Sequence, residues 1–235
     1  MQRSLSGIVF ASVLIFSILY SKISFITLFF LLMLVCIFEF KRMIKLQSVF
    51  PYLIGTLAFV FGNILNVEDV PSKQIFQYAG VALFLVIFIT FASILFAKKE
   101  EVISHLGKIF LTIVYIVVPF TLMVQIPFLN STFNYANTTI LGVFILIWTS
   151  DTFAFIIGKN FGKHKLLERI SPNKTIEGFF GGLIFTFIAS FILAKQFTSL
   201  SLVQWLVIAG IVSVFGVLGD LIESMFKRQA GVKDS

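Results

Sequence analysis

Long apolar runs recur along the whole chain and constrain its fold more than any other feature. They cover residues 6–21, 23–40, 49–66, 75–97, 109–129, 140–158, 178–194 and 202–222. Most come close to the ~20 residues that an α-helix needs to cross a bilayer. The sequence therefore predicts an all-α polytopic membrane protein, a bundle of about eight transmembrane helices forming one membrane domain over residues 1–235.

The composition excludes an ordinary soluble domain. Hydrophobic residues make up 58% of the chain and charged residues only 12%, about half the charged fraction usual in soluble domains. The single cysteine, Cys36, lies within an apolar run, so an intrachain disulfide is impossible and a metal cluster is not indicated.

The basic charge follows the expected topology. With a cytoplasmic N-terminus, all of the 18 Lys and Arg residues except Lys22, Lys73 and Lys195 fall on the cytoplasmic side. Such asymmetry over short loops is the positive-inside pattern. We therefore expect both termini in the cytoplasm, and the net charge of +7 needs no nucleic-acid partner.

The last apolar run leads into a polar stripe. Asp220, Glu223, Ser224 and Lys227 follow a helical spacing that places them on one face. Ionisable groups at the edge of a bilayer are costly unless they face protein, water or a ligand. A Glu223–Lys227 pair, worth ~0.3 kcal/mol, explains Glu223 but leaves the deeper Asp220 as a candidate for function.

A second candidate carboxylate, Asp151, interrupts the run 140–158. A hydrogen bond to a Ser or Thr of a neighbouring helix is the structural alternative to a functional role, which we favour because the position lies within the membrane.

The cytoplasmic loop after this run presents Lys174 just before the next helix. A lysine beside the free amides of a helix N-terminus suits a phosphate. Helix capping is the alternative, since Ser171-Pro172 is a good helix-start signal by itself, and the residues leave both open. Gly178 and Gly182 form a GxxxG pattern, which favours close helix packing.

The polar residues indicate a class of chemistry. His105 and His164 stand alone and are expected at the surface, and no Ser-His-Asp set, cysteine nucleophile or Walker loop is present. Carboxylates combined with lysines and arginines instead match Mg²⁺-dependent phosphoryl or nucleotidyl transfer.

Two motifs in residues 148–235 carry a family resemblance. They are Ser224-x-x-Lys227-Arg228-x4-Lys233-Asp234, preceded by Gly219-Asp220, and the loop from Ser171 to Gly178. The chain thereby resembles the phosphatidate cytidylyltransferases (CDP-diacylglycerol synthases). The resemblance implies transfer of CMP from CTP to phosphatidic acid, a membrane lipid, with release of pyrophosphate. It also implies an enzyme in the bacterial inner membrane with its site facing the cytoplasm, and leaves a homodimer open.

The resemblance also assigns roles. Asp220, Lys227 and Asp234 would be catalytic, with Asp220 a ligand of Mg²⁺. The nucleotide and its phosphates would be bound by Asp151, Lys174, Ser224, Arg228 and Lys233. Residues 141–235 would then carry the chemistry and residues 1–140 the membrane frame.

The family signature continues with His-Gly-Gly and Asp-Arg-x-Asp, whereas the sequence ends at Ser235. We therefore expect a fragment or an inactive truncated relative as alternatives to a working enzyme. Phe155 replaces a tyrosine frequent in the family. Two further alternatives are a CTP-dependent lipid-alcohol kinase and a cation-coupled transporter using Asp151, although no repeated halves typical of transporters are evident.

Overall fold

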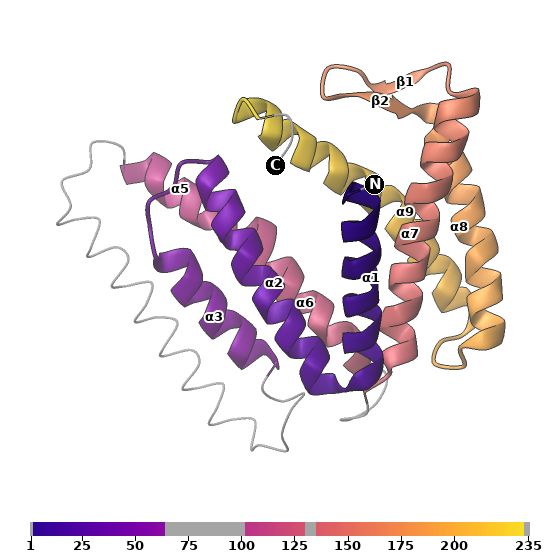
Figure 1. Cartoon of the computed structure of the whole chain (residues 1–235), viewed down its shortest axis with the longest axis horizontal. Helices are drawn as coiled ribbons and strands as arrows, with labels where there is room; N and C mark the ends of the chain where they lie inside the picture. The colour runs from indigo at the N-terminus through magenta and orange to yellow at the C-terminus, as the bar shows by residue number, and fades with distance from the viewer. Residues whose placement is uncertain (1, 64–101, 130–134, 233–235) are drawn as a thin grey trace. The chain divides into compact units, whose positions relative to one another are not determined.

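The computed structural model describes residues 2–63, 102–129 and 135–232, and it shows a helical protein (Figure 1). The chain separates into two compact units, Met1–Tyr135 and Ala136–Ser235.

The first unit is built from α-helices with short π and 3-10 segments. They are α1 (Gln2–Tyr20), α2 (Lys22–Met43), α3 (Phe50–Asn63), α5 (Val102–Thr112), η2 (Ile113–Val117), α6 (Val118–Gln125) and η3 (Ile126–Phe128). Between α1 and α2, Ser21 and Ser24 form a capping box that begins α2 immediately after the turn. The π-helical segment η2 ends at Val117, two residues before Pro119, which cannot donate a helical hydrogen bond.

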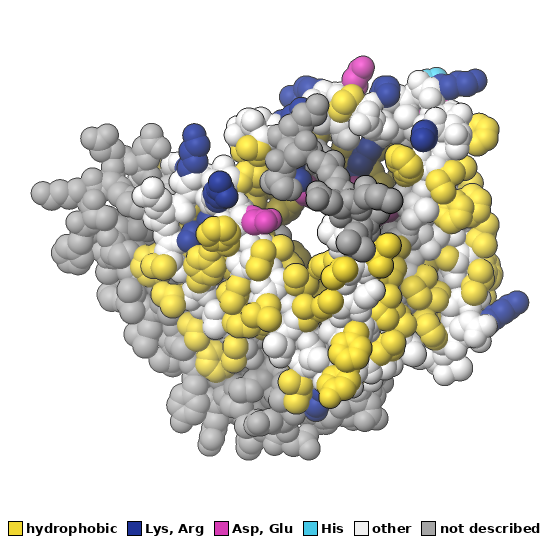
Figure 2. Space-filling model, in the orientation of Figure 1, with side chains coloured by type: hydrophobic (Ala, Val, Ile, Leu, Met, Phe, Trp, Pro, Cys, Tyr) yellow, Lys and Arg dark blue, Asp and Glu magenta, His cyan; other side chains and the backbone are white. Residues whose placement is uncertain are grey.

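The described helices confirm the prediction of an all-α polytopic membrane protein. Five of them are long and apolar enough to cross a bilayer, and the apolar helices Ser6–Tyr20 and Phe50–Asn63 are shorter. Each expected span coincides with described helices except 75–97, which lies outside the described residues. Large hydrophobic side chains such as Phe180, Ile184 and Ile188 are exposed along α8, and Figure 2 shows such side chains over wide areas of the surface.

The second unit consists of three long helices and a small hairpin. Its elements are α7 (Asn137–Phe161), β1 (Lys165–Leu167), β2 (Ser171–Thr175), α8 (Ile176–Gln196) and α9 (Leu202–Gln229). The core of the unit is formed by Leu146, Leu193, Trp205 and Ala209. The antiparallel hairpin projects from one end of the α7–α8 pair (Figure 1).

Glycines bring α7 and α8 into close contact. A Cβ on Gly178 would lie 2.6 Å from the Ala154 carbonyl oxygen, and one on Gly182 would lie 2.8 Å from that of Ser150. Backbone meets backbone at these positions, so no side chain fits between the helices. The predicted packing role of the GxxxG pattern is confirmed.

Helix α8 begins just after Lys174, as predicted, but Ser171-Pro172 does not start it. Ser171 and Pro172 belong to strand β2, and Thr175 is the N-cap, its hydroxyl accepting the Gly178 N–H at 3.1 Å. The alternative in which Ser171-Pro172 starts the helix is therefore wrong. A two-stranded hairpin has only edge strands, which accommodate proline.

Candidate active site

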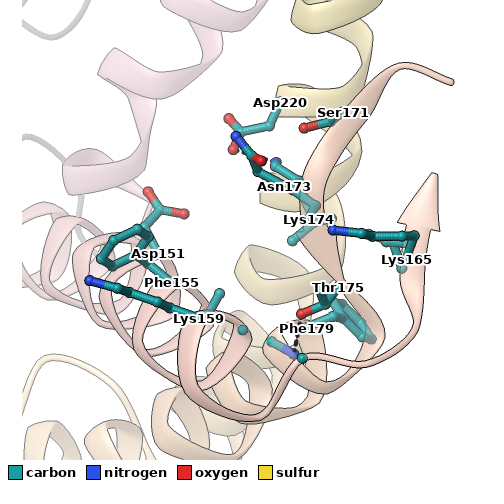
Figure 3. A pocket seen from close by; sticks show the side chains of 16 residues that line it. Asp151, Phe155, Lys159, Lys165, Ser171, Asn173, Lys174, Thr175, Phe179 and Asp220 are labelled. Atoms are coloured by element: carbon teal, nitrogen blue, oxygen red, sulfur yellow. Dashed lines mark hydrogen bonds and ion pairs between the residues drawn. The ribbon is translucent and has the colours of Figure 1, made fainter. Parts of the chain in front are cut away.

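A cavity of about 780 Å³ opens where α7, the hairpin, α8 and α9 come together (Figure 3). Polar and charged side chains line much of it, namely Asp151, Lys159, Lys165, Ser171, Asn173, Lys174, Thr175 and Asp220. Apolar contacts come from Phe155, Leu166, Phe179 and Val217. The cavity therefore combines charges of both signs with apolar wall, all within the second unit.

Helix α7 contributes one face to the cavity. Asp151, Phe155 and Lys159 line it and recur at four-residue spacing, which places them along one side of a helix. Figure 3 shows the three side chains following one another along α7. The carboxylate that interrupts the apolar run thus faces a polar cavity.

An ion pair joins the hairpin to α9. The Lys174 Nζ donates to Asp220 Oδ2 at 2.6 Å, with 26% and 54% of the two side chains exposed. Asp151 lies within electrostatic range of both partners. The three residues predicted from separate segments of the sequence are therefore brought to one cavity.

A second pocket of about 340 Å³ adjoins the first and shares Ser171 and Asn173 with it. Ser224, Lys227 and Arg228 contribute to its lining. The Lys227 Nζ pairs with Glu223 Oε1 at 2.7 Å, so the predicted pair within α9 is confirmed.

The remaining predicted site residues, Lys233 and Asp234, lie outside the described residues. Their assigned roles stay predictions.

His164 differs from the prediction. It is at the surface as expected, with 75% of its side chain exposed, but its Nδ1 lies 2.6 Å from Glu177 Oε1, so it does not stand alone. The contact arises because the hairpin folds back onto the start of α8. Nothing in the spacing of the two residues indicates it.

Several cavity residues were missed by sequence reasoning, notably Lys159, Lys165 and Asn173. The helical spacing from Asp151 could have indicated Lys159. Lys165 reaches the cavity wall because it pairs with Thr175 across the hairpin, which the sequence did not reveal.

The two cavity carboxylates suit a metal ion that a bound ligand also coordinates. No group of three or more His, Cys, Asp or Glu side chains that could hold an ion occurs among residues 2–63, 102–129 and 135–232. Two carboxylates, Asp151 and Asp220, face the cavity. Mg²⁺ commonly takes one or two carboxylates and completes its shell with substrate phosphates and water, so this donor set fits it.

Taken together, the two pockets match a polyanionic ligand that has an apolar portion. Lysines and an arginine can balance phosphate charge, while the two cavity carboxylates can share a divalent ion with phosphate oxygens. Such an arrangement acts by positioning and electrostatic stabilisation.

Comparisons with known proteins agree with this chemistry. The model of the cytidylyltransferase family matches residues 1–235. A phosphatidate cytidylyltransferase of Bacillus subtilis (strain 168) is 36% identical over 243 residues, covering 100% of this chain and 86% of the relative. One from Staphylococcus epidermidis (strain ATCC 12228 / FDA PCI 1200) is 35% identical over 211 residues, covering 88% of this chain and 76% of the relative. The chain belongs to the cytidylyltransferase family.

Proposed function

We propose that this chain is a phosphatidate cytidylyltransferase, which converts CTP and phosphatidic acid to CDP-diacylglycerol and pyrophosphate. The observation that carries the proposal is the Lys174–Asp220 pair, which shares one cavity with Asp151. The family match over residues 1–235 and the names of the relatives support the same reaction.

The reaction is a displacement at phosphorus. A phosphate oxygen of phosphatidic acid attacks the α-phosphorus of CTP, and the bond between that phosphorus and the oxygen bridging to the β-phosphate breaks. Pyrophosphate leaves with the bonding electrons. Both substrates are anionic, so cations must offset their repulsion before the oxygen can approach.

The cations of the two pockets are suited to this task. Lys174 would bind phosphate in the larger cavity, and Lys227 and Arg228, with the Ser224 hydroxyl, would bind it in the smaller one. Arg228 offers several donors in a plane that matches phosphate oxygens. Lys233 and Asp234 would extend this set, as the family resemblance implies.

Asp220 would hold Mg²⁺, with Asp151 as the second carboxylate at the cavity. When bound, the ion offsets negative charge on phosphate oxygens. Lys174 keeps the Asp220 carboxylate directed at the cavity before substrate arrives. The Lys174 ammonium group, at the same cavity, would bind phosphate.

We further propose that the site faces the cytoplasm of a bacterium, where CTP is available, and lies in its inner membrane. The basic loops expected on that side support the orientation. Residues 141–235 would carry the chemistry and residues 1–140 the frame. A homodimer stays a prediction.

Product analysis tests the reaction. Membranes containing the chain receive Mg²⁺, phosphatidic acid and CTP labelled in the α-phosphate, and membranes lacking it serve as the control. We expect label in CDP-diacylglycerol and one pyrophosphate for each labelled lipid. Labelled CDP with an unlabelled phosphorylated lipid would show a CTP-dependent kinase instead, and an absence of turnover would contradict the proposal.

A further inference from the structure

Glu177 stands outside the cavity and yet holds together the segment that delivers Lys174 to it. Its carboxylate accepts the backbone N–H of Lys163 at 3.1 Å and that of His164 at 3.2 Å. The imidazole Nδ1 of His164 lies 2.6 Å from the same carboxylate. One side chain in the first turn of α8 thus makes three contacts with the residues that enter the hairpin.

These contacts close the base of the hairpin. The Ile176 N–H donates to the His164 carbonyl at 2.9 Å, so the residues entering and leaving the hairpin meet at this point. Lys165 pairs with Thr175 one step further out. Without the carboxylate, the amides of Lys163 and His164 would have no other hydrogen-bond acceptor among the contacts that the structure gives for them.

The base of the hairpin determines where Lys174 lies. Lys174 comes immediately before the N-cap Thr175. Its Nζ lies 2.6 Å from Oδ2 of Asp220 on α9. A two-stranded hairpin has little stability of its own, so its position depends on its attachment. Charge-assisted hydrogen bonds to backbone amides are among the stronger attachments available.

We propose that Glu177 is a positioning residue that holds the hairpin base so that Lys174 can bind the phosphates of CTP. The inference rests on the proposed function, because it takes CTP as the ligand of Lys174. Glu177 itself does not line the cavity, so its effect on nucleotide binding passes through the hairpin.

The test compares Glu177→Ala with Glu168→Ala in the full chain. Glu168 lies in the turn of the same hairpin, its side chain is exposed, and the structure gives it no ion pair. Its substitution by alanine removes the same charge. We expect Glu177→Ala to raise the KM for CTP about tenfold, since a displaced Lys174 would lose a charge-assisted hydrogen bond to phosphate, and Glu168→Ala to leave it unchanged. A merely structural loss would reduce the amount of active protein, and hence the apparent kcat, without moving this KM.

A conservative variant and a second readout keep the test decisive. Glu177→Gln retains an acceptor oxygen without the charge, so its KM for CTP should fall between wild type and Glu177→Ala. Hydrogen exchange of residues 163–176 in unliganded protein should accelerate in Glu177→Ala and not in Glu168→Ala. If Glu177→Ala does not fold, Glu177→Gln is measured in the same two ways.

The outcomes separate the two proposals. An inactive wild type whose hairpin exchange still depends on Glu177 would overturn the proposed function and, with it, the link to CTP. An active wild type would overturn the positioning role if the Glu177 variants kept its KM for CTP. The same conclusion would follow if hairpin exchange were unchanged, or if the Glu168 variant lost affinity equally.

Discussion

Lys174 and Asp220 illustrate how a polar pair can serve function more than stability. Their side chains are 26% and 54% exposed, and ion pairs of that exposure contribute under about 1 kcal/mol. The stability gained from the pair is therefore too small to explain why a helix as apolar as α9 carries a carboxylate at this position. Its place on the cavity wall gives a better reason.

Removing the cation tests this reading. Lys174→Ala should weaken CTP binding about tenfold, because a hydrogen bond from a charged group is worth roughly 1.5–3 kcal/mol, and should change the free energy of unfolding by under about 1 kcal/mol. Equilibrium binding of labelled CTP measures the affinity. Lys195→Ala, in the last turn of α8, is the matched control. Equal affinity for CTP in both variants would show that Lys174 has only a structural role.

At the scale of the helices, glycines set how closely α7 and α8 pack. They place α7, which carries Asp151, directly against the start of α8. A methyl group at Gly178 would meet the Ala154 carbonyl oxygen at 2.6 Å and the Gly158 Cα at 3.1 Å, so backbone would have to move.

Gly178→Ala should accordingly destabilise the protein by about 1–3 kcal/mol. Gly216→Ala is the control, since a Cβ there meets nothing within 4 Å, and alanine favours a helix over glycine by up to ~1 kcal/mol. Unfolding in detergent micelles, followed by circular dichroism, compares the two. Equal stability of both variants would show that the close approach has no energetic importance.

The helices could be predicted because a membrane-spanning helix is encoded by one continuous apolar segment of the sequence. Apolar runs near 20 residues marked the described spans, and the spacing of Gly178 and Gly182 marked a crossing. The hairpin could not, since strands of three and five residues are too short for a periodic pattern. Its position depends instead on Glu177, which reaches Lys163 and His164 from another element.

The same limit applies to the site. Asp151 and Asp220 stood out because a carboxylate in an apolar run is rare. Lys159 and Lys165 did not, because lysines in a cytoplasmic loop are ordinary positive-inside charge. The helical spacing from Asp151 could have indicated Lys159, whereas only the fold places Lys165 at the cavity.

Across the chain, every described site residue belongs to the unit Ala136–Ser235. Its helices place the hairpin at the end of α7 and the α8–α9 connection at the opposite end of α8 (Figure 1). If α8 crosses the bilayer, these two segments lie on opposite sides of it. The charge distribution predicts that the hairpin side is cytoplasmic.

Cysteine labelling tests this orientation. In a Cys36→Ser background, Glu168→Cys on the hairpin should react with an impermeant maleimide only in inverted vesicles. Thr198→Cys, in the α8–α9 connection, should react in intact cells and is the control for access. The reverse pattern would contradict a cytoplasmic site.

The most direct measurement is the Mg²⁺-dependent synthesis of CDP-diacylglycerol by Asp220→Asn beside Glu223→Gln. Both changes remove one carboxylate charge from α9, but only Asp220 lines the cavity, while Glu223 pairs with Lys227. Asp220→Asn should lower the rate by about 100-fold or more with membrane insertion intact, and Glu223→Gln should stay near wild type. Retained Mg²⁺-dependent synthesis by Asp220→Asn would contradict the role of this carboxylate at the reaction centre.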